Sequence, residues 1–451
     1  MPRVGVILQR RFTRGLIGRA EALERAWRAG TRSLRIRYGP WKYSRHLRPD
    51  DPLQGWKIHV TATILSAGDV FSRVHPILTK YDTAFKVPAR LEFLAALNSG
   101  LGNFSQIGKF ITVYPVNETE AVRLAQELHA ATRGIDGPKI PFDVRYRKRT
   151  LVSYRYGSFS AVETNGTQTS IVDPGGRLHA DLRDRAHAIP KWMRDPFEKR
   201  RSKPARLRVT NSIGLDLLPF KALAQRGKGG VYQAVDLSVW PVRLVIIKEG
   251  RRHGETDWLG QDGFARVKRE GRLLRELRQH GLPVSEPLRE FTERGNRYLV
   301  LEQIVGRPLL SRNRVQPTRT SWRRAKNLRD QISPLLEAIH RAGYVWRDCK
   351  PEHIFVCHGK ICFIDFEGAC RISDIGLLPW GSGPYLPPIY RKPFADRRAG
   401  TLEDDYALGV IVFQFLSGKF PPHSARLRSR VYRETHCPDH LRLDIETLLK
   451  F

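Results

Sequence analysis

The chain has 451 residues, of which 41% are apolar and 27% are charged. This length predicts two or three domains, and the composition excludes a chain that is disordered throughout. Lysine and arginine number 78 against 45 aspartates and glutamates, which gives a formal net charge of +33. Such an excess predicts a polyanionic partner: a phosphorylated substrate, an acidic peptide, an acidic membrane surface or nucleic acid.

Membrane insertion and secretion are both disfavoured. The longest apolar run, residues 408–416, is shorter than the roughly 18 residues that a membrane span needs. Five cysteines in a chain of this length do not form the framework of a disulfide-rich protein. The first residues lack the apolar core of a signal peptide. We therefore expect a bacterial-type cytoplasmic protein without a membrane span.

Periodicity predicts the elements of the first half. Alternating or continuous apolar residues predict strands, and apolar residues at helical spacing predict helices. A short amphipathic helix is expected within residues 16–27 of the basic N-terminal stretch. The later strands and helices are expected, in chain order, at residues 56–64, 67–80, 91–98, 110–114 and 118–132.

The second half begins with strands and continues with helices. The polar, basic stretch Lys199–Arg206 is the predicted domain boundary. We expect a basic arm over residues 1–40, a first domain over 41–205, a second over 206–435 and a tail over 436–451. The arm is expected to be solvated, and the alternative is an arm that docks on a membrane surface or a peptide. Beyond the boundary, strands are predicted at 230–235, 244–248 and 298–302, and helices at 322–342 and 404–417.

Features that suit phosphoryl transfer follow one another in the second half. A glycine-rich turn with Gly227, Gly229 and Gly230 lets backbone amides approach a phosphate closely. Lys248 ends a buried strand, and Glu270 lies on a helical stretch from which it can pair with Lys248. Taken singly, each of these features also has a structural explanation, such as a tight hairpin or a surface ion pair.

Two polar loops complete this set. In residues 346–353, Asp348 would take the proton of an attacking hydroxyl, and Lys350 would steady the γ-phosphate. In residues 363–368, Asp365 would hold Mg²⁺ across the phosphates. The hinge that starts at Glu302 would bind the base of ATP or GTP through its backbone, so the sequence does not choose between the two nucleotides.

This half resembles protein kinases from about Leu217 to Pro422. The resemblance implies a bilobal fold, with His353 at the position of the second metal-holding residue, usually an asparagine. Glu367 replaces the third residue of the DFG motif, and Ile389 replaces the glutamate of the APE motif. An inactive kinase is the alternative, but Lys248, Asp348 and Asp365 are all present.

Cationic residues stand beside aromatic ones in the first half. Lys57 and His59 are two residues apart on a predicted strand, so they face the same side. Lys86 follows Phe85, Lys109 opens another predicted strand, and Arg155 lies between two tyrosines. These side chains could line a phosphate-binding cleft, whereas the plainer interpretation is a solvated strand surface.

The segments that carry these cations resemble the N-terminal domain of class III and class IV lanthipeptide synthetases. That domain is related to bacterial phosphothreonine lyases, and in the family a divergent kinase follows it directly. The resemblance covers about Trp41 to Phe197 and implies an α+β chain, a lyase-like mixed α/β domain followed by the kinase. The matching segments are residues 55–63, 84–87, 97–99, 108–115 and 154–157.

The resemblance also implies the chemistry. The kinase phosphorylates Ser or Thr of a ribosomal precursor peptide, and the lyase then eliminates the phosphate to leave a dehydroamino acid. It makes Lys86 the general base, with a pKa lowered by nearby cations, His59 the general acid, and Lys57 the group that polarises the carbonyl. The implied phosphate-binding residues are Lys109, Arg155 and, less strongly, Tyr114.

Two alternatives concern the whole protein. Members of this family continue into a cyclase domain, so we expect this chain to dehydrate without cyclising, unless a separate cyclase joins it or the chain is truncated. The chain could also be a Ser/Thr protein kinase, or a small-molecule kinase similar to lipopolysaccharide core kinases, with the first half as a docking module. Nucleic-acid binding is disfavoured because only the net charge suggests it.

Overall fold

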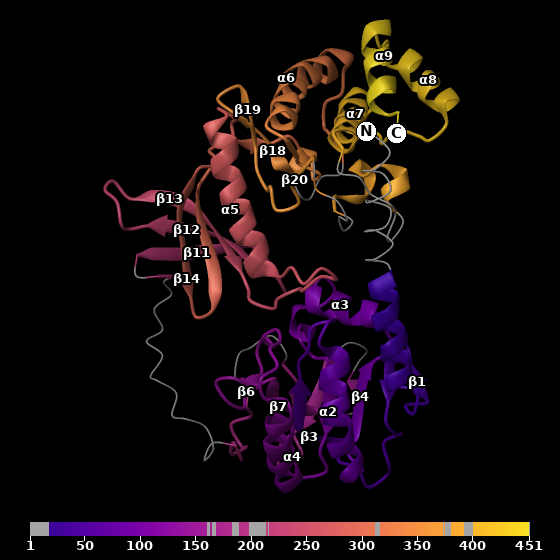
Figure 1. The fold of residues 1–451 in the computed structure, drawn as a ribbon, viewed down its shortest axis with the longest axis vertical. Helices are drawn as coiled ribbons and strands as arrows, with labels where there is room; N and C mark the ends of the chain where they lie inside the picture. Colours follow the sequence, from indigo (N-terminus) through magenta and orange to yellow (C-terminus); the bar gives the residue numbers. More distant parts are fainter. Residues whose placement is uncertain are drawn as a thin grey trace.

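The computed structural model of the chain describes residues 18–450, apart from 160–162, 165–167, 183–188, 198–212, 215, 312–315, 373, 375–379 and 392–399. The predicted boundary at Lys199–Arg206 lies outside the described residues. Figure 1 shows one body made of the first half of the chain, and above it a sheet lobe and a helical lobe made of the second half.

The first domain is built on an antiparallel sheet of seven strands in the order β1-β2-β4-β5-β3-β7-β6. A smaller sheet has the order β10-β9-β8. The strands are β1 Ile36–Tyr38, β2 Trp41–Tyr43, β3 Gln54–Val60, β4 Ala84–Pro88, β5 Ile111–Tyr114, β6 Val144–Arg145, β7 Val152–Ser158, β8 Glu163–Thr164, β9 Gln168–Val172 and β10 Leu178–Ala180.

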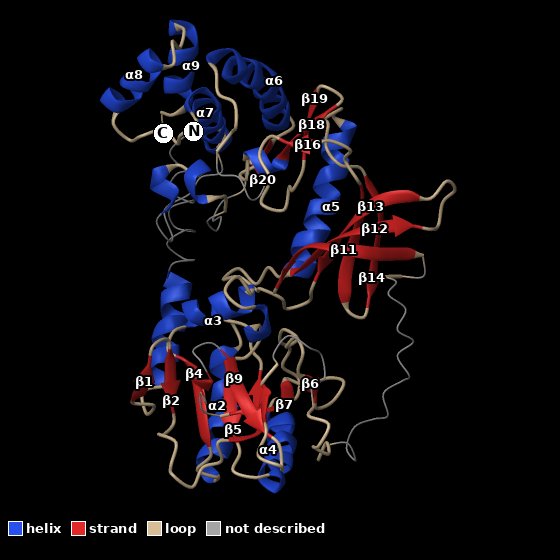
Figure 2. Cartoon of the chain, turned by 180° about the vertical axis from the view of Figure 1, so that it is seen from behind, coloured by secondary structure: helices blue, strands red, loops and turns tan. Residues whose placement is uncertain are grey.

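Three helices accompany the large sheet: α2 Ala67–Lys80, α3 Leu91–Ser99 and α4 Glu118–Ala131. Ile58, Val113 and Phe85 are paired across β3, β5 and β4 and are all buried, so one face of the sheet forms the core under α2 and α4. Figure 1 views the domain from the helix side, and Figure 2 from the opposite side. The helices and strands predicted for this half are confirmed.

The expectation of a solvated N-terminal arm is wrong for the described part of it. Residues 18–30 form a helix. Trp27 is buried in the core of the first domain, its indole N–H donates to Pro88 O at 3.1 Å, and Leu34 is buried beside it. The basic residues between these apolar positions cover the outer side of a helix that belongs to the domain.

The small lobe of the second half is a five-stranded antiparallel sheet in the order β11-β12-β13-β15-β14. One helix, α5, packs against this sheet. The residue before its first turn, Asp262, caps the helix by accepting a hydrogen bond from Ala265 N at 2.9 Å. The elements are β11 Leu217–Arg226, β12 Gly229–Asp236, β13 Arg243–Gly250, α5 Gly263–Gln279, β14 Pro287–Glu293 and β15 Asn296–Glu302.

The large lobe is mainly helical. It contains β16 Arg307–Pro308, α6 Trp322–Arg341, β17 Tyr344–Val345, β18 Ile354–Cys357, β19 Lys360–Phe363, β20 Cys370–Arg371, α7 Leu402–Ser417, α8 Ala425–Glu434 and α9 Asp439–Leu448. Almost every residue of α7 is buried, which accounts for the long apolar run. Among the helices that the structure describes, none has the length and apolarity to cross a membrane.

The C-terminal residues are also part of a core, so the expectation of a tail over residues 436–451 is wrong for the described residues up to 450. Leu441 and Ile445 of α9 are fully buried. At Gly409 of α7, an added Cβ would come within 2.8 Å of Leu448. The absence of a side chain at Gly409 lets the two helices approach closely.

The glycine-rich turn between β11 and β12 touches the first domain. Gly227 N donates to Ser99 O, at the end of α3, at 3.0 Å. A Cβ at Gly227 would come within 1.7 Å of Asn98 O, so this approach requires glycine. The Arg251 guanidinium lies 5.6 Å from the centre of the Phe104 ring. The two halves of the chain therefore meet at the turn that was predicted to bind phosphate.

Candidate functional site

A cleft separates the two lobes of the second half. Two cavities of about 710 Å³ and about 500 Å³ share Lys248, Glu270, His353 and Asp365 in their walls. The larger is lined by the glycine-rich turn and the two polar loops. The smaller is lined by residues of the sheet, including Glu302, and by residues of α5 and of the large lobe. The cleft thus has a polar part suited to phosphates and a more apolar part suited to a nucleotide base.

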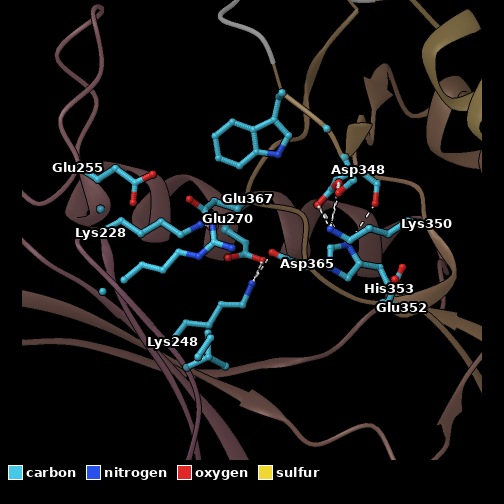
Figure 3. A pocket seen from close by; sticks show the side chains of 18 of the residues that line it. Lys228, Lys248, Glu255, Glu270, Asp348, Lys350, Glu352, His353, Asp365 and Glu367 are labelled. Atoms are coloured by element: carbon cyan, nitrogen blue, oxygen red, sulfur yellow. Dashed lines mark hydrogen bonds and ion pairs between the residues drawn. The ribbon is translucent and has the colours of Figure 1, made fainter. Parts of the chain in front are cut away.

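Lys248 links the sheet, α5 and the Asp365 loop. Its Nζ donates to Glu270 Oε1 at 2.6 Å and to Asp365 Oδ1 at 2.9 Å (Figure 3). Burial lowers the pKa of Lys248, but Asp365 and Glu270 outweigh that effect, so its pKa lies above the ordinary value. Glu270 is itself buried, and burial raises its pKa despite the nearby Lys248. The predicted pairing of Lys248 with Glu270 is confirmed.

A buried carboxylate of α7 fixes the backbone of the Asp348 loop. Asp404 is fully buried and accepts hydrogen bonds from Trp346 N and Arg347 N, each at 2.8 Å. Arg347 and Asp365 have positive φ angles of 69° and 64°, a conformation that costs energy for residues with a side chain. The Trp346 indole donates to Asp365 O at 3.0 Å, which couples the two strained loops.

Asp348, His353 and Asp365 form a group whose possible ligand atoms all lie within 4.8 Å of one another. His353 Nε2 lies 3.4 Å from Asp365 Oδ2. Burial lowers the pKa of His353 despite the two carboxylates, so the imidazole stays neutral and able to bind a metal. Burial raises the pKa of Asp365, but Lys248 and His353 lower it by more. The pKa therefore lies below the ordinary value, which favours the carboxylate form. Two carboxylates fit Mg²⁺, whereas the imidazole is a less usual ligand for it.

Lys350 and Ser382 orient Asp348. Lys350 Nζ donates to Asp348 Oδ2 at 3.0 Å and to Ser382 Oγ at 2.8 Å, and Ser382 Oγ donates to Asp348 Oδ1 at 3.0 Å. Sequence reasoning missed Ser382 as a site residue. The signal for it was the stretch 381–388, which resembles the peptide-positioning segment of protein kinases.

The predicted lyase cations lie on one face of the large sheet. Lys57 is paired with Arg155 on β7, and His59 is paired with Thr112 on β5, which is paired with Lys86 on β4. Because neighbours in register point to the same side, these four side chains share the face opposite the helices. Lys57 Nζ is 5.9 Å from the Tyr114 ring centre, which places Tyr114 beside this group.

Acidic side chains accompany the cations. His59 Nδ1 lies 2.6 Å from Asp143 Oδ2, and Lys109 Nζ lies 3.6 Å from Asp143 Oδ1. Arg155 donates to the carboxylate of Asp181. Lys109 precedes β5 rather than opening it. Asp143 was missed because it lies in an irregular segment that sequence patterns do not connect with β3.

The pKa of His59 lies below the ordinary value for an imidazole. Burial, together with Lys109, lowers its pKa to about 4, although Asp143 acts in the opposite direction. His59 is therefore neutral at pH 7 in the ligand-free protein. A phosphate dianion arriving beside it would raise its pKa and favour the protonated form that an acid catalyst needs.

This shift predicts how stability depends on pH. The unfolded chain binds a proton on His59 near pH 6.5 and the folded protein only near pH 4, so this contribution is complete above pH 6.5 and is lost as the pH falls toward 4. Between pH ~7 and pH ~5, the protein should lose roughly 2 kcal/mol more unfolding free energy than its His59→Asn variant. Urea unfolding at the two pH values measures this difference, and equal losses in both proteins would contradict it.

Comparisons with known proteins agree with this geometry. The RamC N-terminal domain family matches residues 19–209, and the protein kinase domain family matches residues 223–446. Together the two family models cover most of the chain, one over each half. The fold class predicted from the sequence is thereby confirmed, and so is the resemblance to class III and class IV lanthipeptide synthetases.

Individual relatives cover the chain to different extents. The probable SapB synthase of Streptomyces coelicolor is 32% identical over 393 residues, which are 83% of this chain and 40% of the relative. The probable serine/threonine-protein kinase PknB of Lactococcus lactis is 28% identical over 211 residues, 45% of this chain and 32% of that kinase. Similarity to the kinases is thus limited to the second half, whereas similarity to the synthase extends over both domains, although the chain spans only 40% of that synthase.

Proposed function

We propose that this chain dehydrates Ser and Thr residues of a precursor peptide in two steps, phosphorylation with ATP and Mg²⁺ followed by elimination of phosphate. The observation that carries the proposal is the presence, in one chain, of an assembled kinase cleft and a sheet face on which Lys57, His59, Lys86 and Arg155 lie together. Similarity to a SapB synthase across both domains supports it.

In the first step, Asp348 accepts the proton of the Ser or Thr hydroxyl while that oxygen bonds to the γ-phosphorus, and ADP leaves. Lys350 and Ser382 hold Asp348 in place for this transfer. Lys248, fixed by Glu270, binds the phosphates. Asp365 and His353 would hold Mg²⁺, which supplies charge neutralisation at the phosphates when it is bound.

In the second step, Lys86 removes the α-proton of the phosphorylated residue, the bond between Cβ and the phosphate oxygen breaks, and a carbon–carbon double bond forms. His59 gives its proton to the leaving phosphate, and Asp143 holds the imidazole through Nδ1. Lys57 stabilises the negative charge on the carbonyl oxygen. Arg155, Lys109 and Tyr114 bind the phosphate group. Lys86 must be neutral for this role, and the lowering of its pKa by its neighbours stays a prediction.

The proposal is tested with a short Ser- and Thr-rich peptide encoded beside the gene. With ATP and Mg²⁺, the protein should give a product lighter than the peptide by one water per processed residue, as measured by mass spectrometry. A synthetic phosphoserine peptide should release inorganic phosphate without any nucleotide. A phosphorylated peptide that is never dehydrated would instead support a Ser/Thr kinase with a docking domain, and an unchanged peptide would refute the proposal.

A further inference from the structure

One side chain projects from the tight turn of the glycine-rich segment. Lys228 is flanked by Gly227 on one side and by Gly229 and Gly230 on the other. Both immediate neighbours must be glycine, since a Cβ would come within 1.7 Å of Asn98 O at Gly227 and of Glu249 O at Gly229. Of residues 227–229, only residue 228 can therefore carry a side chain, and this side chain is a lysine that lines the cleft.

The backbone on both sides of Lys228 is fixed. Gly227 N donates to Ser99 O at 3.0 Å, and Lys228 O accepts from Arg251 N at 2.7 Å. The room around this turn is so small that a Cβ at Gly263 would come within 1.8 Å of Lys228 O. The direction in which the Lys228 side chain leaves the turn is therefore set by the fold.

The Lys228 side chain crosses the larger cavity to the loop of Asp365. Its Nζ donates to Glu367 Oε2, and Figure 3 shows the two side chains close to each other inside the cleft. Lys228 Nζ also lies 5.7 Å from the centre of the Trp380 ring. Lys228, Glu367 and Trp380 line the same cavity as Asp348 and Asp365, where the phosphates of a nucleotide are proposed to bind.

Glu367 keeps a cationic neighbour when Lys228 moves away. It is only 8% exposed, and its Oε1 is buried without a hydrogen-bond partner. Arg266 of α5, itself 6% exposed, has Nη1 3.9 Å from Glu367 Oε1. Loss of Lys228 would therefore not leave the Glu367 carboxylate as an isolated buried charge, which would cost several kcal/mol.

We propose that Lys228 is a phosphate-binding residue of the kinase site, held ready in the cleft by Glu367 and transferred to the nucleotide phosphates when ATP binds. The polyphosphate carries more negative charge than the single carboxylate, so it attracts the ammonium group more strongly. Arg266 then remains beside Glu367. This inference rests on the proposed kinase function and adds to it a cation whose bonding partner changes with nucleotide binding.

The test measures Mg·ATP binding to the full chain by titration calorimetry. Lys228→Ala should weaken ATP binding about tenfold to a hundredfold, the usual effect of losing a hydrogen bond between charged groups. Glu367→Gln should bind ATP at least as tightly as the unaltered protein, because a neutral amide competes less with the phosphates for Lys228. Lys268→Ala, which removes an exposed lysine of α5, is the matched control and should bind ATP normally.

Two results would overturn the inference. One is ATP binding by Lys228→Ala that equals that of the control. The other is an equal loss of affinity in Glu367→Gln and Lys228→Ala, which indicates that the pair only clamps the loops together. Lys228→Gln serves if the alanine variant does not fold, as judged by its melting temperature. Failure of the unaltered protein to bind Mg·ATP would refute the kinase function itself, so the two failures are distinguishable.

Discussion

Asp365→Asn should abolish phosphorylation of the peptide while leaving the protein folded. The substitution removes one of the two carboxylates of the group formed with Asp348 and His353, and with it the charge that favours a metal ion there. Lys248 keeps Glu270 as a partner, so the fold of the cleft should persist. Loss of several kcal/mol of transition-state stabilisation lowers the rate by roughly a thousandfold or more. Transfer of labelled phosphate from ATP to the peptide measures this rate.

The matched control for this prediction is His353→Asn. An amide oxygen is a better ligand for Mg²⁺ than an imidazole, so this variant should retain phosphorylation and even exceed the original rate. Both variants change the same group of side chains, so a general disturbance of the loops would lower both rates equally. Full labelling of the peptide by Asp365→Asn would exclude Asp365 as the main metal ligand and with it the proposed kinase chemistry.

Lys86→Ala should convert the enzyme into one that stops after phosphorylation. The variant lacks the proposed base, while the kinase cleft lies in the other domain and is unchanged. Loss of a general acid or base lowers a rate by about a hundredfold to ten-thousandfold, so phosphopeptide should accumulate and dehydration should become slow. Mass spectrometry distinguishes the heavier phosphopeptide from the lighter dehydrated product.

His59→Ala should trap the same phosphopeptide, because it removes the proposed acid of the same step. The exposed Lys80, at the end of α2, provides the control, and Lys80→Ala should dehydrate the peptide normally. Undiminished dehydration by Lys86→Ala would remove that residue from the mechanism. If neither the Lys86 nor the His59 variant yielded phosphopeptide, phosphorylation and elimination would not be separate steps in this protein.

The sequence predicted most of the secondary structure and the placement of the kinase residues. Helices such as α2 and α4 have a strong apolar period, and β3, β5 and β13 carry apolar residues that can pack only in a core. Lys248 and Asp365 stand in segments whose order fixes their meeting in a cleft, and the structure joins them at 2.9 Å. Helices and strands are readable because their patterns involve neighbours along the chain, whereas a shared site for Lys248 and Asp365, 117 residues apart, was implied by the resemblance to protein kinases.

Contacts between distant irregular segments were not predictable. Asp143 is 84 residues from His59, and Ser382 is 34 residues from Asp348, with no periodic pattern in either segment to relate them. A helix was expected within residues 16–27, but the packing of the helix over residues 18–30 into the first domain was not, because its arginines hide the apolar positions Ala20 and Trp27. The low pKa of His59 follows from complete burial, which depends on the assembled domain.

The hydrogen bond from Gly227 N to Ser99 O limits how the two halves can be recombined. The end of α3 that receives this bond is itself anchored, since the Asn98 amide donates to Ala62 O at 3.0 Å and accepts from Gly108 N at 3.1 Å. Gly108 precedes Lys109, so a single helix end supports both the turn proposed to bind nucleotide and the loop that carries the proposed lyase residue Lys109. A chimaera that grafts this kinase half onto another N-terminal partner must therefore reproduce the Ser99 carbonyl as acceptor and the close approach of Gly227 to Asn98 O. Exchange of whole chains between pathways preserves that fit automatically, whereas exchange of single domains does not.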